Sequence, residues 1–409
     1  MITRLKKKFL YVLFTVPIML SATPACWAEA DSTELKARID ALEKQVAELR
    51  TLLQQQTQQT ATKEDVKAVK QDVASIASKQ DEWKTHDSDV HLAGYGAASY
   101  DGNSDNFTQA QFSPIFHYSY KDLVMMEAEV EMAIGAEDAP SVDLEYADID
   151  LFLTDNLTLT AGKFLTPLGQ FIPNQHPSWI NKMPSMPAGF GHDQAAPVSE
   201  VGIMAKGGIK VPAGHDMYVN YAAYVGNGPH IELTEDGKAI DAIAAEGFTD
   251  DPDGNKIFGG RIGFLPIPNV EIGFSGAGGN VALEGESDRS YRIYDVDFNS
   301  HWKNFRLRGE WVNQLVGSLA SSAVPGKYLL EGWYAQGSYR FLPTKFEGVV
   351  RVSGFDSPHK DLAFDQLALG LDYWFNSHTV AKFAYEFNDG LKGAPANDDR
   401  FLMQLGYGF

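Results

Sequence analysis

Acidic side chains occupy every second position in two stretches of the chain. Glu127, Glu129 and Glu131 form one set, and Asp148 and Asp150 form the other. Alternate residues of an extended strand share one face, so each set would place its carboxylates on a single side of a sheet. Rows of carboxylates that face an aqueous channel attract cations and orient polar solutes.

Basic side chains follow the same alternation over the rest of the chain. They are Lys206, Arg261, Arg306, Arg308, Arg340, Arg351 and Lys382, and Glu310, Glu347 and Glu386 share their phase. If all of these residues face the inside of one closed sheet, an acidic arc lies opposite an arginine-rich arc and a transverse field crosses the lumen. The alternative is that the charges pair with one another and fill a polar interior.

The chain offers little for covalent chemistry. No G-x-S-x-G motif is present, and Ser178 beside His176 is too general a pattern to define a nucleophile and its base. His176, His192 and Asp193 lack a recognised metal-ligand spacing, so they are interpreted as polar loop residues. We therefore expect no enzyme, no metal site and no cofactor.

Strands must position these side chains, because from Val90 onward the apolar residues recur with a period of 2. The sequence predicts sixteen strands, at 90–100, 107–120, 123–134, 142–153, 157–166, 200–209, 216–226, 256–265, 269–278, 289–300, 303–316, 327–342, 345–357, 363–376, 378–389 and 399–409. An even number of strands closes an antiparallel barrel without an open edge. The predicted fold is all-β: a 16-stranded antiparallel transmembrane β-barrel preceded by an N-terminal α-helical coiled coil.

Short and long connections alternate between the predicted strands. The tight turns are Lys121-Asp122, Asp155-Asn156, Pro266-Ile267-Pro268, Pro343-Thr344 and Asn376-Ser377, and the longest connections are 167–199 and 227–255. A barrel inserted from one side of a membrane has this asymmetry, with its short turns on the periplasmic side.

Charge and hydropathy narrow the class of protein. The chain has 409 residues, a formal net charge of −20 and a mean hydropathy of −0.23. So acidic a protein is repelled by nucleic acid, which we exclude as a partner. Beyond the first two dozen residues, no apolar run approaches the roughly 20 residues of a membrane helix.

Two segments precede the predicted barrel, which is assigned to residues 86–409. Residues 1–30 have the basic start, apolar stretch and small residues of a signal peptide, with cleavage after Ala28 or Ala30. Cys26 would be acylated under the alternative interpretation as a lipoprotein. Residues 31–85 carry heptad-spaced apolar residues and are predicted to form a periplasmic coiled-coil stalk, a lone amphipathic helix being the alternative.

The chain also resembles known outer-membrane proteins. Its end, Tyr407-Gly408-Phe409, is similar to the terminal aromatic signal that the barrel assembly machinery recognises. Gly162-Lys163-Phe164 followed by Pro167-Leu168-Gly169 resembles the strand-to-loop passage of the phosphate-selective porin O/P superfamily. That superfamily includes dicarboxylate and siderophore-linked porins, some of which have an N-terminal coiled coil.

The resemblance implies a trimeric Gram-negative porin in which loop 167–199 folds inward and narrows the channel. The alternative is an outward surface loop. His176, Lys182, His192 and Asp193 are its charged or titratable candidates for the constriction. Phosphate selectivity in the superfamily relies on arginines and loop lysines, whereas Lys182 is the single lysine of this loop.

We therefore expect a passive porin of the outer membrane, with its stalk in the periplasm, for small hydrophilic solutes that include charged ones. The expected partners are further copies in a homotrimer, outer-membrane lipid and lipopolysaccharide, the barrel assembly machinery through Phe409, and peptidoglycan through the stalk. The alternatives are a gated or substrate-specific uptake channel, for a siderophore or a dicarboxylate, and a structural protein that tethers the envelope. The sign of selectivity stays open, because the acidic loop 227–255 favours cations and the lumen arginines favour anions.

Overall fold

The computed structural model describes residues 87–409 apart from 136–139 and 213–215. The predicted signal peptide, residues 1–30, and the predicted stalk, residues 31–85, lie outside the described residues. In the part of the chain that is described, no helix combines the length and the apolar character needed to cross a membrane.

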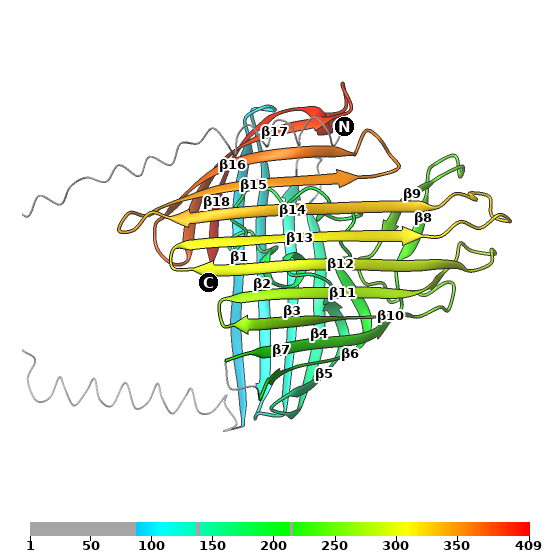
Figure 1. The fold of residues 1–409 in the computed structure, drawn as a ribbon, viewed down its shortest axis with the longest axis horizontal. Coiled ribbons are helices and arrows are strands. Elements are labelled where there is room, and N and C mark those ends of the chain that lie inside the picture. The colour runs from blue at the N-terminus through cyan, green and yellow to red at the C-terminus, as the bar shows by residue number, and fades with distance from the viewer. Residues whose placement is uncertain (1–86, 136–139, 213–215) are drawn as a thin grey trace, which may run out of the picture. The chain divides into compact units, whose positions relative to one another are not determined.

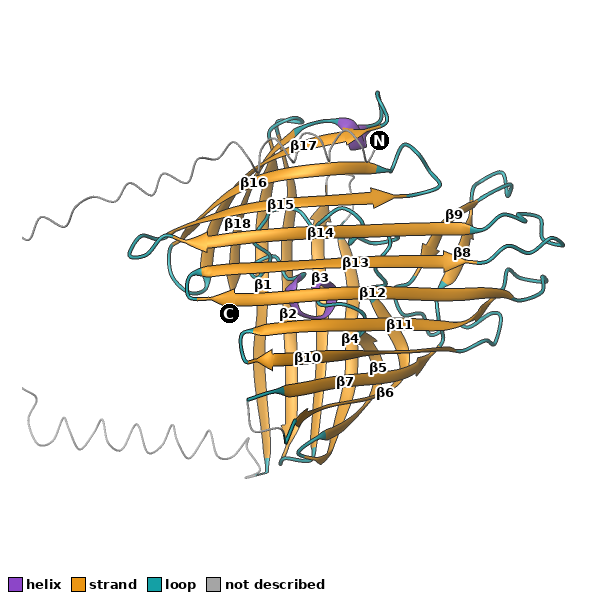
Figure 2. Ribbon diagram, viewed as in Figure 1, coloured by secondary structure: helices purple, strands orange, loops and turns teal. Residues whose placement is uncertain are grey.

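Sixteen strands form one closed antiparallel barrel (Figures 1 and 2). They are β1 (Ser88–Asp101), β2 (Asn106–Tyr120), β3 (Val124–Gly135), β4 (Ser141–Thr154), β5 (Leu157–Leu165), β6 (Ser199–Lys210), β7 (Tyr218–Gly226), β10 (Ile257–Ile267), β11 (Val270–Val281), β12 (Arg289–Trp302), β13 (Phe305–Val316), β14 (Tyr328–Arg340), β15 (Phe346–Asp356), β16 (Phe364–Trp374), β17 (Thr379–Gly390) and β18 (Arg400–Gly408). Each strand pairs with the next strand of the barrel, and β18 pairs with β1, so no edge stays open. The predicted sixteen-stranded barrel is confirmed.

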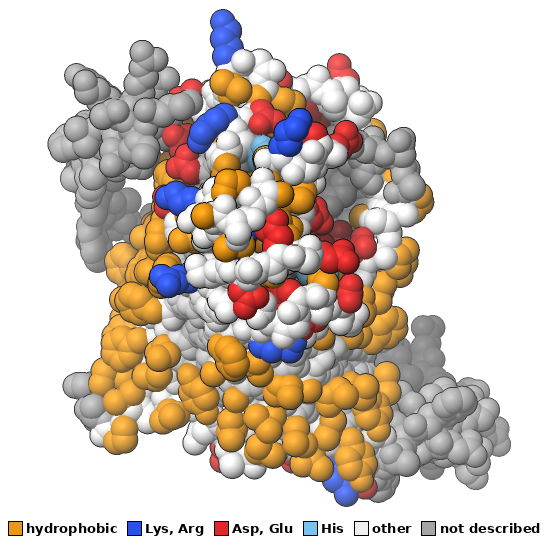
Figure 3. Space-filling model, turned by 90° about the vertical axis from the view of Figure 1, so that its right-hand side faces the viewer, with side chains coloured by type: hydrophobic (Ala, Val, Ile, Leu, Met, Phe, Trp, Pro, Cys, Tyr) orange, Lys and Arg blue, Asp and Glu red, His pale blue; other side chains and the backbone are white. Residues whose placement is uncertain are grey.

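Alternation of side chains gives the wall an apolar outside and a polar inside. On β16, Leu369 and Leu371 are 46% and 44% exposed, whereas the inward-pointing Asp372 is fully buried. On β18, Leu405 is exposed and its neighbour Gln404 is buried. Figure 3 faces the end of the barrel that carries β8 and β9, and it shows hydrophobic side chains over the outside of the wall and acidic ones among the loops.

One predicted turn is displaced. The turn predicted at 266–268 lies at 268–269, because β10 continues to Ile267, which pairs with Val270 of β11. The register between these strands shifts between Phe264 and Ile267. A proline is tolerated at such an irregularity because its nitrogen is not required for a ladder hydrogen bond, which explains why Pro266 lies inside a strand.

Connection 227–255 contains a hairpin that the alternation of residues does not predict. Strands β8 (His230–Leu233) and β9 (Ile240–Ala244) pair with each other outside the barrel sheet. Ile240, Ile243 and Ala244 of β9 are buried. The hairpin therefore folds against the rest of the protein and is not a solvated loop.

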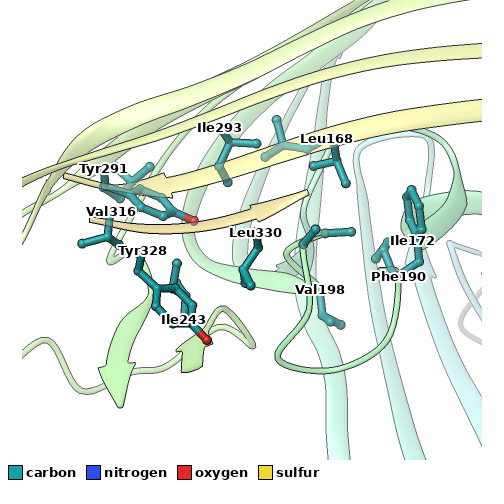
Figure 4. Close-up of a cluster of buried hydrophobic side chains, with 14 of the residues drawn as sticks. Leu168, Ile172, Phe190, Val198, Ile243, Tyr291, Ile293, Val316, Tyr328 and Leu330 are labelled. Atoms are coloured by element: carbon teal, nitrogen blue, oxygen red, sulfur yellow. The ribbon is translucent and has the colours of Figure 1, made fainter. Parts of the chain in front are cut away.

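The largest apolar core lies inside the barrel. Segment 167–199 and β9 contribute Leu168, Ile172, Phe190, Val198 and Ile243, and strands β12, β13 and β14 contribute Tyr291, Ile293, Val316, Tyr328 and Leu330 (Figure 4). Phe190 also packs edge-to-face on Phe171 and Tyr334, with ring centroids 5.6 and 5.1 Å apart. This core holds segment 167–199 against the inner face of β12–β14.

Candidate functional site

Segment 167–199 leaves β5 and turns into the barrel at Gly169. Gly169 has a φ of 72°, and a Cβ at this position would lie 1.9 Å from Oε1 of Glu310 on β13, so the turn requires glycine. The short helix α4 (Phe171–Gln175) follows, and the backbone N–H of Phe171 donates to Glu310 Oε2 at 2.8 Å. The Glu310 side chain therefore anchors the start of the segment to the inner wall.

Two fully buried basic side chains hold the middle of the segment. Arg351 on β15 donates to the Ser185 carbonyl oxygen at 2.9 Å and to Ser185 Oγ at 2.6 Å. Lys382 on β17 donates to the carbonyl oxygen of Ser178. Arg351 and Lys382 are 0% and 1% exposed, so these two members of the predicted basic arc face the segment and not an open lumen.

Two more predicted residues take part in the same contact. Arg308 on β13 donates to Gln175 Oε1 at 2.6 Å. Lys182 of the segment donates to Glu347 on β15 at 3.1 Å and lies 4.5 Å from the centre of the Trp374 ring. Burial lowers the pKa of Lys182, and the nearby Glu347 carboxylate opposes this shift. Segment 167–199 thus lies along the inner face of β13–β17.

The remaining predicted basic residues mostly pair within the wall. Lys206 lies 2.9 Å from Asp150, and Arg261 lies 2.7 Å from Asp297. Arg340 lies 3.9 Å from Glu347, and Arg306 is exposed near the start of β13. The alternative in which lumen charges neutralise one another therefore describes several of these residues.

The predicted acidic residues lie on β3 and β4, across the closed sheet from β13 and β14. Glu127, Glu129 and Glu131 lie 2.8, 2.6 and 2.5 Å from His117 Nε2, Tyr95 Oη and Gln111 Nε2. Asp148 and Asp150 share the inward face of β4, where Asp150 is buried. The anchors of segment 167–199 described above lie on β13, β15 and β17, so they do not involve the acidic residues of β3 and β4.

Glu145 belongs to this acidic wall, although it is absent from the predicted set. Val142 and Leu144 are exposed on the outer face, and so is Ile149, which means that the alternation changes phase between 144 and 149. The register of β3 and β4 shifts at this point, and the irregularity turns Glu145 inward, where it is 9% exposed. The sequence carries a signal of this change, because the outward apolar residues switch from even positions, Val142 and Leu144, to an odd position, Ile149.

A pocket lies between segment 167–199 and the wall formed by β1–β4 and β18. Gln111, Glu131 and Glu145 line it from the wall, and His176, Ser178 and His192 line it from the segment. None of the described residues that line this pocket is lysine or arginine. Of the four segment residues predicted from the sequence, His176 and His192 thus line the pocket, whereas Lys182 lies on the anchored side of the segment.

The two histidines of the pocket differ in protonation state. His176 Nδ1 lies 2.5 Å from the Ile172 carbonyl oxygen, and burial lowers the pKa of this imidazole to about 4. His192 Nδ1 lies 2.5 Å from Glu246 Oε1, and this hydrogen bond raises the pKa of His192 to about 9. At neutral pH, His176 is therefore neutral and His192 carries a positive charge balanced by Glu246.

Asp193 is exposed, has a φ of 55° and does not line the pocket. Over the described ranges, no three His, Cys, Asp or Glu side chains are grouped so as to hold a metal ion.

No protein-family model and no curated protein matches the chain. Among solved structures, OmpF of Salmonella typhi in complex with daunomycin aligns with 79% of this chain and 97% of its own, at 11% identity and a TM-score of 0.50. A loop-deletion mutant of OmpT, an outer membrane protein of Vibrio cholerae, covers 79% and 99% at 11% identity and a TM-score of 0.48. The anion-selective porin of Comamonas acidovorans covers 79% and 100% at 13% identity and a TM-score of 0.47. The chain thus shares its barrel fold with outer-membrane porins.

Proposed function

We propose that the protein is a porin of the Gram-negative outer membrane through which small hydrophilic solutes diffuse passively. The wall supports this proposal, because its outward side chains are apolar along the strands and its inward side chains are polar or charged. A barrel of sixteen strands is also wide enough for water and solutes, whereas an eight-stranded barrel is filled by its own side chains.

The observation that carries the proposal is the placement of segment 167–199. Glu310, Arg351 and Lys382 tie the segment to one side of the inner wall, and a polar pocket lies between it and the other side. A segment held by buried charges keeps its position, so it narrows the lumen without closing it. In this proposal, the pocket is part of the constriction.

The other parts of the proposal follow from the sequence. The protein forms a trimer in contact with lipid and lipopolysaccharide, its assembly uses the terminal Phe409, and residues 31–85 form a periplasmic stalk that contacts peptidoglycan. Ser178 Oγ and His176 Nε2 are both buried and make no hydrogen bond within the described residues, so they do not form a nucleophile–base pair.

Planar-bilayer recording tests this function. Protein purified from outer membranes should give steady ohmic steps, in groups of three for a trimer, and the reversal potential under a salt gradient should give the sign of selectivity. A folded barrel that conducts no ions would refute passive diffusion and favour a gated carrier or a tethering role.

A further inference from the structure

We propose that the pocket between segment 167–199 and β1–β4 is a binding subsite for organic amines, which are cations that donate hydrogen bonds. The inference rests on the proposed porin function and names the class of solute that the constriction prefers. Three features of the pocket carry it: a carboxylate without a hydrogen-bond partner, an imidazole nitrogen that can only accept, and a described lining that contains no lysine or arginine.

The first feature is the carboxylate of Glu145. Glu145 is nine-tenths buried and lines the pocket, yet within the described chain no residue gives it a hydrogen bond or an ion pair. Glu131 lies in the same lining and receives one hydrogen bond, from Gln111. A nearly buried carboxylate without a partner is unfavourable, and a cation in the pocket would relieve this.

The second feature is the orientation of His176. The Ile172 carbonyl oxygen can only accept, so the hydrogen bond at 2.5 Å requires the proton on Nδ1 of the imidazole. Nε2 of the neutral ring is then an acceptor, and it is buried beside the pocket without a partner among the described residues. An ammonium group, which has three donors and no acceptor, satisfies such an atom, whereas a carboxylate or phosphate ligand would not.

The third feature is the placement of the positive charges. Arg308, Arg351 and Lys382 are engaged with segment 167–199 on its other side. His192 lines the pocket, but Glu246 balances its charge. Lys163 on β5 also acts electrostatically on Glu145, although it does not line the pocket. Glu131 and Glu145 therefore leave the pocket with a negative excess, although the wall as a whole carries many arginines.

The lining also suits the carbon chain of an amine. Ile172, Met186 and Phe190 contribute apolar surface next to the acceptors. A bare inorganic cation gains nothing from this surface, whereas the methylene groups of an alkylamine do. The combination therefore favours a short alkyl diamine over K⁺.

Current blockade by 1,4-diaminobutane tests the proposal on the full-length protein in a bilayer at high KCl. Succinate and 1,4-butanediol have the same chain length with negative and no charge, respectively. We expect the diamine to block the current and the other two to have little effect.

The double variant Glu131→Gln with Glu145→Gln should weaken the block by about tenfold or more, since it removes two charged acceptors. Glu235→Gln removes a carboxylate from the exposed loop between β8 and β9, outside the pocket, and should leave the block unchanged because salt screens that site.

Equal block by the diamine and the diol, or an unchanged block in the double variant, would overturn the amine subsite and leave the porin function standing. If the barrel folds but carries no current, the porin function fails. Calorimetry of diamine binding to the protein in detergent, with the same variants, then decides the subsite.

Should the double variant not fold, Met186→Cys in a Cys26→Ser background replaces it. The pocket thiol should react faster with a cationic than with an anionic thiol reagent, relative to a free thiol, and equal relative rates would overturn the proposal.

Discussion

Gly169 shows how one residue determines whether segment 167–199 can enter the barrel. Its φ of 72° lies in the left-handed region, and the space that a side chain would need is occupied by the Glu310 carboxylate. The same carboxylate accepts the N–H of Phe171, so displacing it would also loosen helix α4. The glycine and the glutamate therefore act as one anchor.

Gly169→Ala should lower the free energy of unfolding by more than the backbone effect alone, which is about 1–2 kcal/mol for a side chain in the left-handed region. Gly237 is the matched control, because it has a φ of 66° and nothing within 4 Å of the position that a Cβ would take. Gly237→Ala should show the backbone effect only. Urea unfolding of both variants in lipid vesicles measures the difference, and equal losses would contradict the steric anchor.

The pair of His192 and Glu246 gives a prediction of pH dependence. Their hydrogen bond raises the pKa of His192 from 6.5 to about 9 and lowers the pKa of Glu246. The stabilisation from the protonated imidazole is complete below about pH 6.5 and is lost as the pH rises through 9. The stabilisation from Glu246 is present above the ordinary carboxyl value and is lost as the pH falls through its lowered value.

NMR titration of the His192 ring in detergent should therefore give a pKa near 9, and Glu246→Gln should bring it back toward 6.5. Glu232→Gln in β8 is the control and should leave the titration unchanged. A midpoint near 6.5 in the unaltered protein would mean that the pair does not form.

At the scale of the elements, the wall could be predicted and the anchors could not. Strand alternation is a local property, so the sixteen strands and the inward phase of Gln404 or Asp372 follow from the sequence. The contact of Arg351 with Ser185 joins residues 166 positions apart, and no local pattern encodes it. The hairpin β8–β9 and the inward turn of Glu145 were missed because packing and a register shift decide them.

Arg351→Met tests the anchoring of the whole segment. Removing this buried cation leaves Ser185 and Glu386 without one of their partners, so we expect a loss of about 3–5 kcal/mol in the free energy of unfolding. A loosened segment should also give larger and noisier single-channel steps.

Arg306→Met is the matched control, because Arg306 shares the inward phase of β13 but is exposed. It should change the stability by about 0.5 kcal/mol or less and leave the noise unaltered. Identical channels from both variants would show that the Arg351 contact does not hold the segment.

At the scale of the whole molecule, the barrel reverses the arrangement of a water-soluble protein. Hydrophobic side chains cover the outside of the wall (Figure 3), and buried charges lie inside. Hydrogen bonds between Gly94 and Phe409 join the two ends of the sheet, so each strand has its backbone groups paired before any side chain contributes. Such a wall suits hydrocarbon, where an unpaired backbone group is highly unfavourable.

Substitutions at Leu369 and Leu391 test whether the exposed outer face of the barrel contacts lipid. The two side chains are 46% and 50% exposed, but Leu369 lies at the middle of β16 and Leu391 lies in the connection after β17. An arginine at mid-bilayer lowers barrel stability by about 2–4 kcal/mol, whereas a solvated loop tolerates it within about 0.5 kcal/mol. Leu369→Arg should therefore be strongly destabilising in vesicles and Leu391→Arg nearly neutral, as measured by urea unfolding in lipid. In a detergent that solvates both positions, the gap should shrink. Equal effects of the two substitutions in vesicles would mean that the outer face of β16 does not contact the bilayer core. This result would refute the membrane location of the barrel.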